Sequence, residues 1–311
     1  MTRVAAIDCG TNSIRLLVAD VDEVSGNLTD VVRTMRVVRL GEGIDRTGEF
    51  SDGALERTFA ACDEYAGLLA AHASPPLRFV ATSATRDAGN RADFVAGVVA
   101  RLGVEPDVIA GDEEAELSFL GAVRGLPRDL LREPVLVVDI GGGSTEFVLG
   151  GELPSHSISV NVGCVRMTER HLRSDPPGIG EIERVEADLA EALATVASAV
   201  PVGDARTLVG VAGSVTTVAA MALDLEAYDP RVLHGAVITR AEVEAVTKRL
   251  LGMTREQRAA LPFMHEGRVD VIAGGAMVLR ALMRAFGQQE VVASETDILD
   301  GIVYRLAALK S

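Results

Sequence analysis

The segment VVDIGGGSTEFVLGG, residues 137–151, decides how this sequence folds. An apolar run leads to Asp139, three glycines follow, and a second apolar run begins after Glu146. Short apolar runs bounded by glycine indicate strands, and glycine permits turns in which the backbone approaches another group closely. The segment therefore predicts a strand, a glycine turn and a second strand. The candidate ligands of such a turn are a nucleotide, a dinucleotide and a bare phosphate, and a purely structural turn is the alternative.

The composition is typical of a globular protein with a strong negative charge. Of the 311 residues, 48% are hydrophobic and 24% are charged, and the formal net charge is −15. This length suits two domains of ordinary size, and the charge argues against a nucleic-acid partner, which needs a broad basic face. No apolar run approaches the roughly 18 residues of a membrane span, and Asp8 interrupts any signal peptide. We therefore expect a cytoplasmic protein with no membrane contact.

Several common phosphate-binding and metal-binding motifs are absent from the sequence. Its only lysines are Lys248 and Lys310, and neither follows a glycine-rich turn, so there is no P-loop. A Rossmann motif must open a helix, whereas residues 144–151 continue as an apolar strand. The three cysteines lie far apart, which argues against a disulfide framework and a zinc site. A phosphate ligand would then depend on backbone N–H groups, arginines and a metal ion.

The segment has an approximate repeat near the N-terminus. AAIDCGTNSIRLLVAD, residues 5–20, and LVVDIGGGSTEFVLGG, residues 136–151, share an apolar strand, an aspartate, glycine, hydroxyl residues and another apolar strand. Such a repeat suggests two related domains. We place them at residues 1–125 and 126–311, and expect a C-terminal helix at about 295–311 to pack back on the first domain. A cleft between two domains is the default ligand site.

Each glycine turn has the chemistry of a phosphate site. Successive N–H groups in a tight turn form a concave site that suits phosphate oxygens, and hydroxyl or amide side chains add donors. A third turn, VGVAGS, supplies a further candidate at residues 209–214. The candidate phosphate-binding residues are Gly10, Thr11, Asn12, Ser13, Gly141, Gly142, Gly143, Ser144, Gly213 and Ser214. The alternative is that these are tight hairpins in which Asp side chains accept from turn N–H groups.

The acids beside the turns predict a divalent cation. A carboxylate at Asp8 or Asp139 repels phosphate unless a cation lies between them, and Mg²⁺ (or Mn²⁺) with retained waters is the natural choice. Cys9 lies inside the first turn but has no histidine near it in sequence, so we do not expect it to be a nucleophile.

Periodicity and turn signals predict the remaining elements. In the first domain we expect strands at 4–8, 14–21, 28–40, 77–84 and 104–110, with helices at 52–73, 92–102 and 112–123. In the second we expect further strands at 155–163, 207–211 and 290–294. Its helices are expected from 164, at 182–199, from 214 to 223, at 271–286 and at 297–309.

Six motifs occur in an order that identifies a family. They are DCGTNSIRLLVADV, TSATRDA, GDEEAELSFLGAV, DIGGGSTEFVLG, VGCVRMTE and GVAGSVTTVAA. Over essentially its whole length the chain resembles the exopolyphosphatase/guanosine pentaphosphate phosphohydrolase family. The resemblance implies an α/β fold of two ribonuclease-H-like (actin-like) domains with an interdomain cleft. The chain is similar in length to the short members of that family.

The resemblance also implies roles for individual residues. Glu114 matches the family's catalytic glutamate, which orients or deprotonates the attacking water, and Glu113 is the alternative. Without the resemblance, acids in this first helical turn would be explained by the helix dipole. Arg86 matches an arginine that contacts substrate phosphate, and Arg166 is a weaker candidate of the same kind.

Metal binding and substrate choice follow from the same resemblance. Asp139 and Glu146 match further acidic site residues, so with Asp8 they are the candidate metal ligands. Leu299 stands where many relatives carry an arginine. With the net charge, this favours short polyphosphates or guanosine pentaphosphate over very long chains.

The implied function is release of terminal orthophosphate from inorganic polyphosphate. Guanosine pentaphosphate 5′-phosphohydrolase activity, a sugar-kinase-like transferase and a non-catalytic alarmone or polyphosphate sensor are the alternatives. The apolar C-terminal helices fit a homodimer and core packing equally well.

Overall fold

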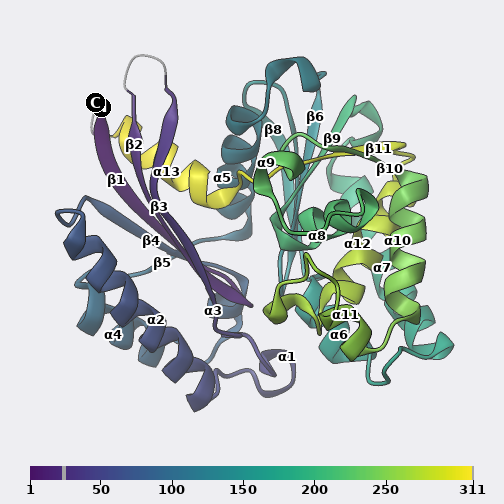
Figure 1. Cartoon of the computed structure of the whole chain (residues 1–311), viewed down its shortest axis with the longest axis horizontal. Helices are drawn as coiled ribbons and strands as arrows, with labels where there is room; N and C mark the ends of the chain where they lie inside the picture. The colour runs from purple at the N-terminus through teal and green to yellow at the C-terminus, as the bar shows by residue number, and fades with distance from the viewer. Residues whose placement is uncertain (23–25, 310–311) are drawn as a thin grey trace. The chain divides into compact units, whose positions relative to one another are not determined.

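The computed structural model describes residues 1–22 and 26–309, which form two compact units (Figure 1). The first contains the described residues of 1–121 and 298–311, and the second contains residues 122–297. The last two residues of the predicted C-terminal helix, 310 and 311, lie outside the described residues. Among the described residues, no helix combines the length and the apolar character that crossing a membrane requires.

The first unit is built on a five-stranded sheet of order β3-β2-β1-β4-β5. Strand β1 pairs with β2 in antiparallel and with β4 in parallel orientation, β3 is antiparallel to β2, and β5 is parallel to β4. The strands are β1 Thr2–Cys9, β2 Ser13–Val21, β3 Leu28–Val37, β4 Leu77–Ala81 and β5 Asp107–Val108. The helices are α1 Ile44–Thr47, α2 Asp52–Ala71, α3 Ser83–Asp87, α4 Arg91–Leu102, α5 Gly111–Gly125 and α13 Ile298–Ala308.

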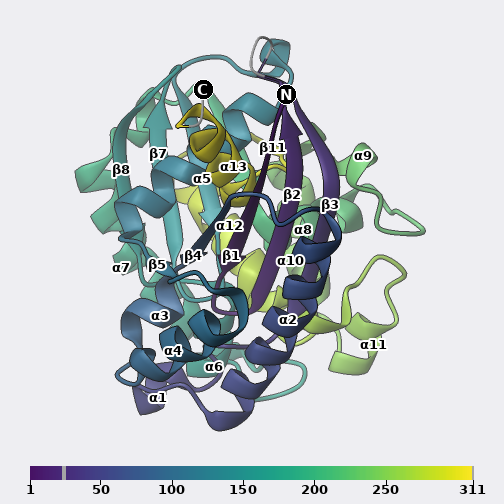
Figure 2. The ribbon, with the colours of Figure 1, turned by 90° about the vertical axis from the view of Figure 1, so that its left-hand side faces the viewer.

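Strand β1 lies at the centre of this sheet and is buried on both faces, because its residues from Val4 to Ile7 are all apolar. Alternate residues such as Ile7 pack with α2 and α4, whereas Val4 and Ala6 pack with the C-terminal helix α13. Figure 1 shows α2 and α4 on one side of these strands and α13 on the other, and Figure 2 turns α2 and α4 toward the viewer. Helix α13 also approaches α5 closely, since a Cβ on Gly301 would stand 2.0 Å from the backbone oxygen of Leu117.

The second unit repeats the arrangement with one additional edge strand. Its sheet has the order β10-β11-β9-β6-β7-β8, in which β6, β7 and β8 are antiparallel neighbours and β9 and β11 run parallel to β6. The strands are β6 Val135–Ile140, β7 Thr145–Gly150, β8 Pro154–Val160, β9 Thr207–Val211, β10 Val237–Thr239 and β11 Glu290–Ala293. The common strand order and directions of the two sheets confirm the predicted α/β fold class with two related domains.

Helices cover the second sheet and close its core. Leu136, Val138 and Ile140 of β6 face one side of the sheet and share a core with α7, α8, α10 and α12. The helices are α6 Cys164–His171, α7 Ile179–Ala199, α8 Ala212–Ala222, α9 Pro230–Leu233, α10 Arg240–Gly252, α11 Arg255–Ala259 and α12 Ile272–Ala285. Three 3₁₀ turns occupy η1 Arg128–Leu130, η2 Val202–Asp204 and η3 Glu266–Arg268.

The structure corrects several predicted boundaries. The strand predicted at 77–84 ends at Ala81, and α3 begins at Ser83, because the N–H groups of Thr85 and Arg86 both bond to the carbonyl of Thr82. Only two of the seven residues predicted as a strand at 104–110 pair in the sheet. Elements α9, β10, α10 and α11 lie in a segment for which the sequence patterns gave no assignment.

Candidate active site

The turn between β1 and β2 is fixed by its own backbone. The Gly10 N–H donates to the carbonyl of Ser13 at 3.0 Å, which closes the turn. The carbonyls of Thr11 and Asn12 accept hydrogen bonds from backbone N–H groups in the loop at residues 38–41. Because C=O and N–H point in opposite directions across a trans peptide, the N–H groups of Asn12 and Ser13 point away from that loop. These two N–H groups therefore do not bond to that loop, and their binding of phosphate stays a prediction.

The turn between β6 and β7 has the same construction. The Gly141 N–H donates to the carbonyl of Ser144 at 3.1 Å, and the carbonyls of Gly141 and Gly142 accept from the first N–H groups of α6. The N–H groups of Gly142 and Gly143 consequently point away from α6. The turn lies so close to the start of α6 that a Cβ on Gly163 would stand 2.4 Å from the Gly142 oxygen.

Arg166 supports this second turn. Its Nε donates to the carbonyl oxygen of Gly143 at 2.7 Å. The guanidinium therefore lies at the edge of the turn and fixes one of its peptides. Its contact with substrate phosphate stays a prediction.

The third turn, between β9 and α8, lies against an arginine side chain that no sequence pattern predicted. A Cβ on Gly213 would stand 2.4 Å from Cζ of Arg268, so this guanidinium packs directly against the glycine. Arg268 Nη1 donates to the hydroxyl of Thr217 at 3.0 Å, which holds it there. Arg268 follows Gly213 by more than 50 residues, in a segment without an assigned element, so no local pattern indicated this contact. Ser214, in the same turn, lies beside α12, because a Cβ on Gly275 would be 2.2 Å from its hydroxyl.

Glu114 and Arg86 meet in the first unit although they lie 28 residues apart. Arg86 Nη1 donates to Glu114 Oε2 at 2.6 Å and to the carbonyl of Ile109 at 3.0 Å. Thr82 links this pair to the first turn: its N–H donates to the carbonyl of Cys9, and its side chain hydrogen-bonds to Glu114. The first unit therefore brings the predicted catalytic residues next to the predicted phosphate-binding turn.

The two adjacent glutamates of α5 have different surroundings. The Glu114 side chain is 10% exposed, whereas that of Glu113 is 38% exposed and pairs with Arg78. Burial raises the pKa of Glu114 to about 7, against the opposing effect of Arg86. A buried acid that titrates near neutrality is a functional-site candidate, so the geometry favours Glu114 over Glu113.

The acids at the strand ends have different partners in the two units. Asp8 lies opposite Arg15 in the ladder of β1 and β2, and its Oδ2 bonds to Arg15 Nη2 at 2.6 Å. Asp139 lies opposite Glu146 in the corresponding ladder of β6 and β7. The same position of the repeat thus carries a cation in the first unit and a second carboxylate in the second unit.

The carboxylates of Asp139 and Glu146 are suitable ligands for a magnesium ion in the second unit. Mg²⁺ is usually bound through one or two carboxylates together with water and substrate phosphates, and Asp139 with Glu146 supplies two carboxylates. Within residues 1–22 and 26–309, no group of three or more His, Cys, Asp or Glu side chains is arranged to hold a metal ion by itself. A cation would therefore need oxygen ligands from water and substrate. The residue opposite Asp8 in its strand ladder is Arg15 rather than a second acid, so the role of Asp8 as a ligand stays a prediction.

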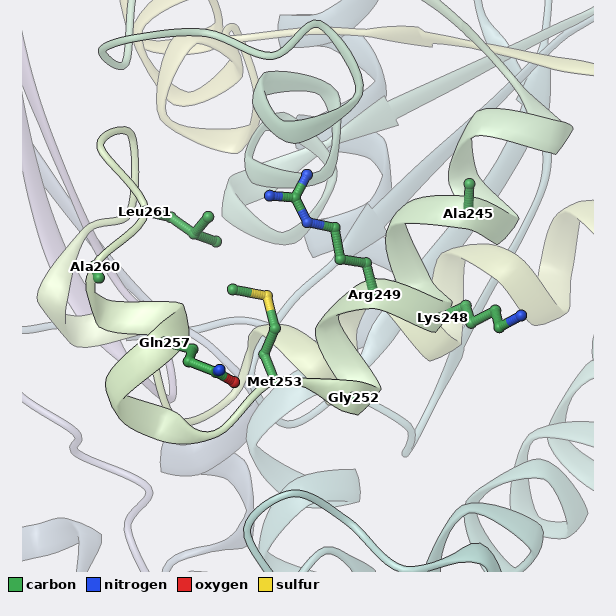
Figure 3. Close-up of a pocket in the computed structure, with 8 residues that line it drawn as sticks. All are labelled: Ala245, Lys248, Arg249, Gly252, Met253, Gln257, Ala260 and Leu261. Carbon is green, nitrogen blue, oxygen red and sulfur yellow. The ribbon is translucent and has the colours of Figure 1, made fainter.

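A separate hollow of about 800 Å³ lies between α10 and α11 (Figure 3). Figure 3 shows Arg249 and Met253 extending into it, while Lys248 points away. No residue of the three turns lines this hollow. It is therefore not part of the candidate active site.

Several known proteins are similar to the chain in both sequence and fold. A model of the Ppx/GppA phosphatase family matches residues 17–310. The chain is 49% identical to Exopolyphosphatase 2 of Mycobacterium tuberculosis, with 99% of each protein covered. It is 44% identical to an exopolyphosphatase-like protein of known crystal structure, with a TM-score of 0.95 and full coverage of both chains. The Aquifex aeolicus member of the Ppx/GppA family is 27% identical, with a TM-score of 0.81 and coverage of 100% of this chain and 99% of the other.

Proposed function

The chain belongs to the Ppx/GppA phosphatase family, and from this premise we propose that it is an exopolyphosphatase. It would release terminal orthophosphate from inorganic polyphosphate by attack of water on the last phosphoanhydride bond. The observation that carries this proposal is the buried Glu114, which is held by Arg86 and linked through Thr82 to the turn between β1 and β2, the predicted phosphate-binding turn. The relative from Mycobacterium tuberculosis that is 49% identical to the chain is named an exopolyphosphatase.

Glu114 is the proposed water-activating residue. A general base works best when its pKa lies near the operating pH, and the raised pKa of Glu114 meets that requirement. Arg86 orients the carboxylate and places positive charge where the transferred phosphoryl group is expected. Cys9, the other reactive group near the turn, is buried, and burial raises the pKa of its thiol well above the usual range. An inert thiol supports water as the nucleophile.

Backbone N–H groups are proposed to bind the substrate phosphates, and two acidic side chains are proposed to bind the metal ion. The N–H groups that point out of the turns at 10–13 and 141–144 are proposed to bind phosphate oxygens, together with the turn at Gly213 and Ser214. Asp139 and Glu146 would hold Mg²⁺ or Mn²⁺, which when bound neutralises negative charge on the phosphates. Catalysis of phosphoryl transfer by positioning and electrostatics requires no covalent intermediate.

The proposed substrates are short polyanions. A net charge of −15 disfavours the binding of a long polyanion along the protein surface. The position at which relatives carry an arginine holds Leu299, whose side chain is buried in the apolar core of the first unit. Guanosine pentaphosphate ends in the same phosphoanhydride bond and is the alternative substrate. The cytoplasmic location and the homodimer stay predictions.

The deciding experiment compares substrates under identical conditions. Orthophosphate release is measured with Mg²⁺ from short-chain polyphosphate, long-chain polyphosphate and guanosine pentaphosphate. We expect the highest kcat/KM on short chains. Faster release from guanosine pentaphosphate would assign the alternative activity, processive degradation of long chains would overturn the length preference, and binding without release would indicate a sensor. Phosphorylation of a sugar acceptor by ATP would indicate a transferase.

A further inference from the structure

Ser159 of β8 completes a row of polar side chains across three neighbouring strands. Asp139 of β6 lies opposite Glu146 of β7, and Glu146 lies opposite Ser159. The Ser159 hydroxyl donates to Glu146 Oε1 at 2.7 Å. The Ser144 hydroxyl, from the glycine turn, donates to the same oxygen at 2.7 Å. One carboxylate oxygen therefore accepts from two hydroxyls that come from different elements.

This arrangement fixes the orientation of the Glu146 carboxylate. The residue is only 1% exposed, so water cannot replace these donors easily. Hydrogen bonds to a carboxylate are shorter and stronger than those between neutral groups. Two donors on one oxygen determine the rotation of the carboxylate about its terminal torsion, which is otherwise broad. The corresponding row in the first unit is Asp8, Arg15 and Met35, which has no hydroxyl in the third strand.

We propose that Ser159 is a positioning residue that orients Glu146 and thereby sets the affinity of the second unit for its divalent cation. The proposal rests on the proposed function, in which Asp139 and Glu146 hold that cation. Ser159 acts through Glu146 and contributes no ligand of its own. Residues that hydrogen-bond to metal ligands typically change metal affinity or activity by about 10- to 100-fold when they are removed. Because Ser144 still bonds the same oxygen, we expect the Ser159→Ala change to give about a 10-fold effect, the lower end of that range.

The test measures metal binding directly. Mn²⁺ is titrated into the full chain in the presence of orthophosphate, and bound Mn²⁺ is read by electron paramagnetic resonance. Ser159→Ala is compared with Ser159→Thr, which keeps the hydroxyl on a strand where a β-branched residue is tolerated. Ser157→Ala is the matched control, because Ser157 lies two residues earlier on β8 and its hydroxyl bonds no other described residue. Thermal unfolding of each variant measures its folding.

The expected pattern is a roughly 10-fold weaker Mn²⁺ affinity for Ser159→Ala, with wild-type values for Ser157→Ala and recovery in Ser159→Thr. The metal concentration that half-saturates phosphate release should rise by the same factor, while KM for the phosphate substrate at saturating metal stays unchanged. Wild-type Mn²⁺ affinity in Ser159→Ala, whether or not its stability falls, would overturn the inference and leave the proposed function intact. A wild-type protein that neither binds Mn²⁺ nor releases phosphate would overturn both.

Discussion

Replacement of Glu114 by Gln removes a carboxylate and conserves the volume of the side chain. If Glu114 activates water, kcat should fall by about 10²- to 10⁴-fold, the range for removal of a positioned general base. KM for polyphosphate should change little, because the phosphate-binding turns are untouched. Glu113→Gln is the matched control, since Glu113 is the adjacent acid but is more exposed and pairs with Arg78. Its loss should leave kcat essentially unchanged, because the Glu113 carboxylate pairs with Arg78 rather than with Arg86, and the exposed ion pair contributes less than about 1 kcal/mol to stability.

The same substitution should stabilise the protein at alkaline pH. Burial raises the pKa of Glu114 from 4.5 to about 7, so between these values the folded state binds more protons than the unfolded state. Stability must therefore fall as pH rises through this window and level off above pH 7. The stability lost across this pH window is on the order of 3 kcal/mol. Because Gln carries no charge at any pH, Glu114→Gln should unfold at a higher temperature than wild type at pH 8 and at a similar temperature at pH 4.

Two measurements on the same preparations check this reasoning. Orthophosphate release is followed from pH 5 to 9, where wild-type activity should rise through about pH 7 as Glu114 loses its proton. Thermal unfolding is recorded at pH 4 and pH 8 for wild type and both variants. Glu114→Gln with wild-type turnover would remove Glu114 from the mechanism. A large loss in Glu113→Gln instead would transfer the role to the neighbouring acid, and a lower unfolding temperature for Glu114→Gln at pH 8 would refute the burial argument.

Chelation with excess EDTA should abolish phosphate release, and added Mg²⁺ or Mn²⁺ should restore it; undiminished turnover in EDTA would exclude a cation at Asp139 and Glu146. Gly213→Ala should lower kcat/KM at nearly unchanged unfolding temperature, because the new methyl group displaces the Arg268 guanidinium; full activity would show that this cation is dispensable. Gly301→Ala should destabilise the chain by about 1–3 kcal/mol, since its methyl group meets a backbone oxygen of α5. A Cβ on Gly67 in α2 would meet no other atom, so Gly67→Ala should stabilise the folded chain by up to about 1 kcal/mol. Thermal unfolding that finds Gly301→Ala more stable than Gly67→Ala would contradict these packing arguments.

Elements with a strong local pattern could be predicted from the sequence. The paired strands around each glycine turn and the long amphipathic helices α2 and α7 formed close to their predicted positions. Errors fell where local and tertiary preferences disagree. The apolar segment at 77–84 was predicted as one strand, but the strand ends at Ala81 and α3 begins at Ser83. This turn into a helix allows Arg86 to reach Glu114.

The sequence by itself determined the two repeated strand–turn–strand units, because alternation, glycine and the aspartate before each turn are local features. Its motifs also identified the family. Only the tertiary structure decided which residues meet at the turns: Arg15 with Asp8, Arg268 with Gly213, and Ser159 with Glu146. Strand ladders and helix packing bring these residues together across distances along the chain that no local pattern spans. The glycine turn at 141–144 could be found from its own residues, whereas the side chains that orient it come from separate strands and helices.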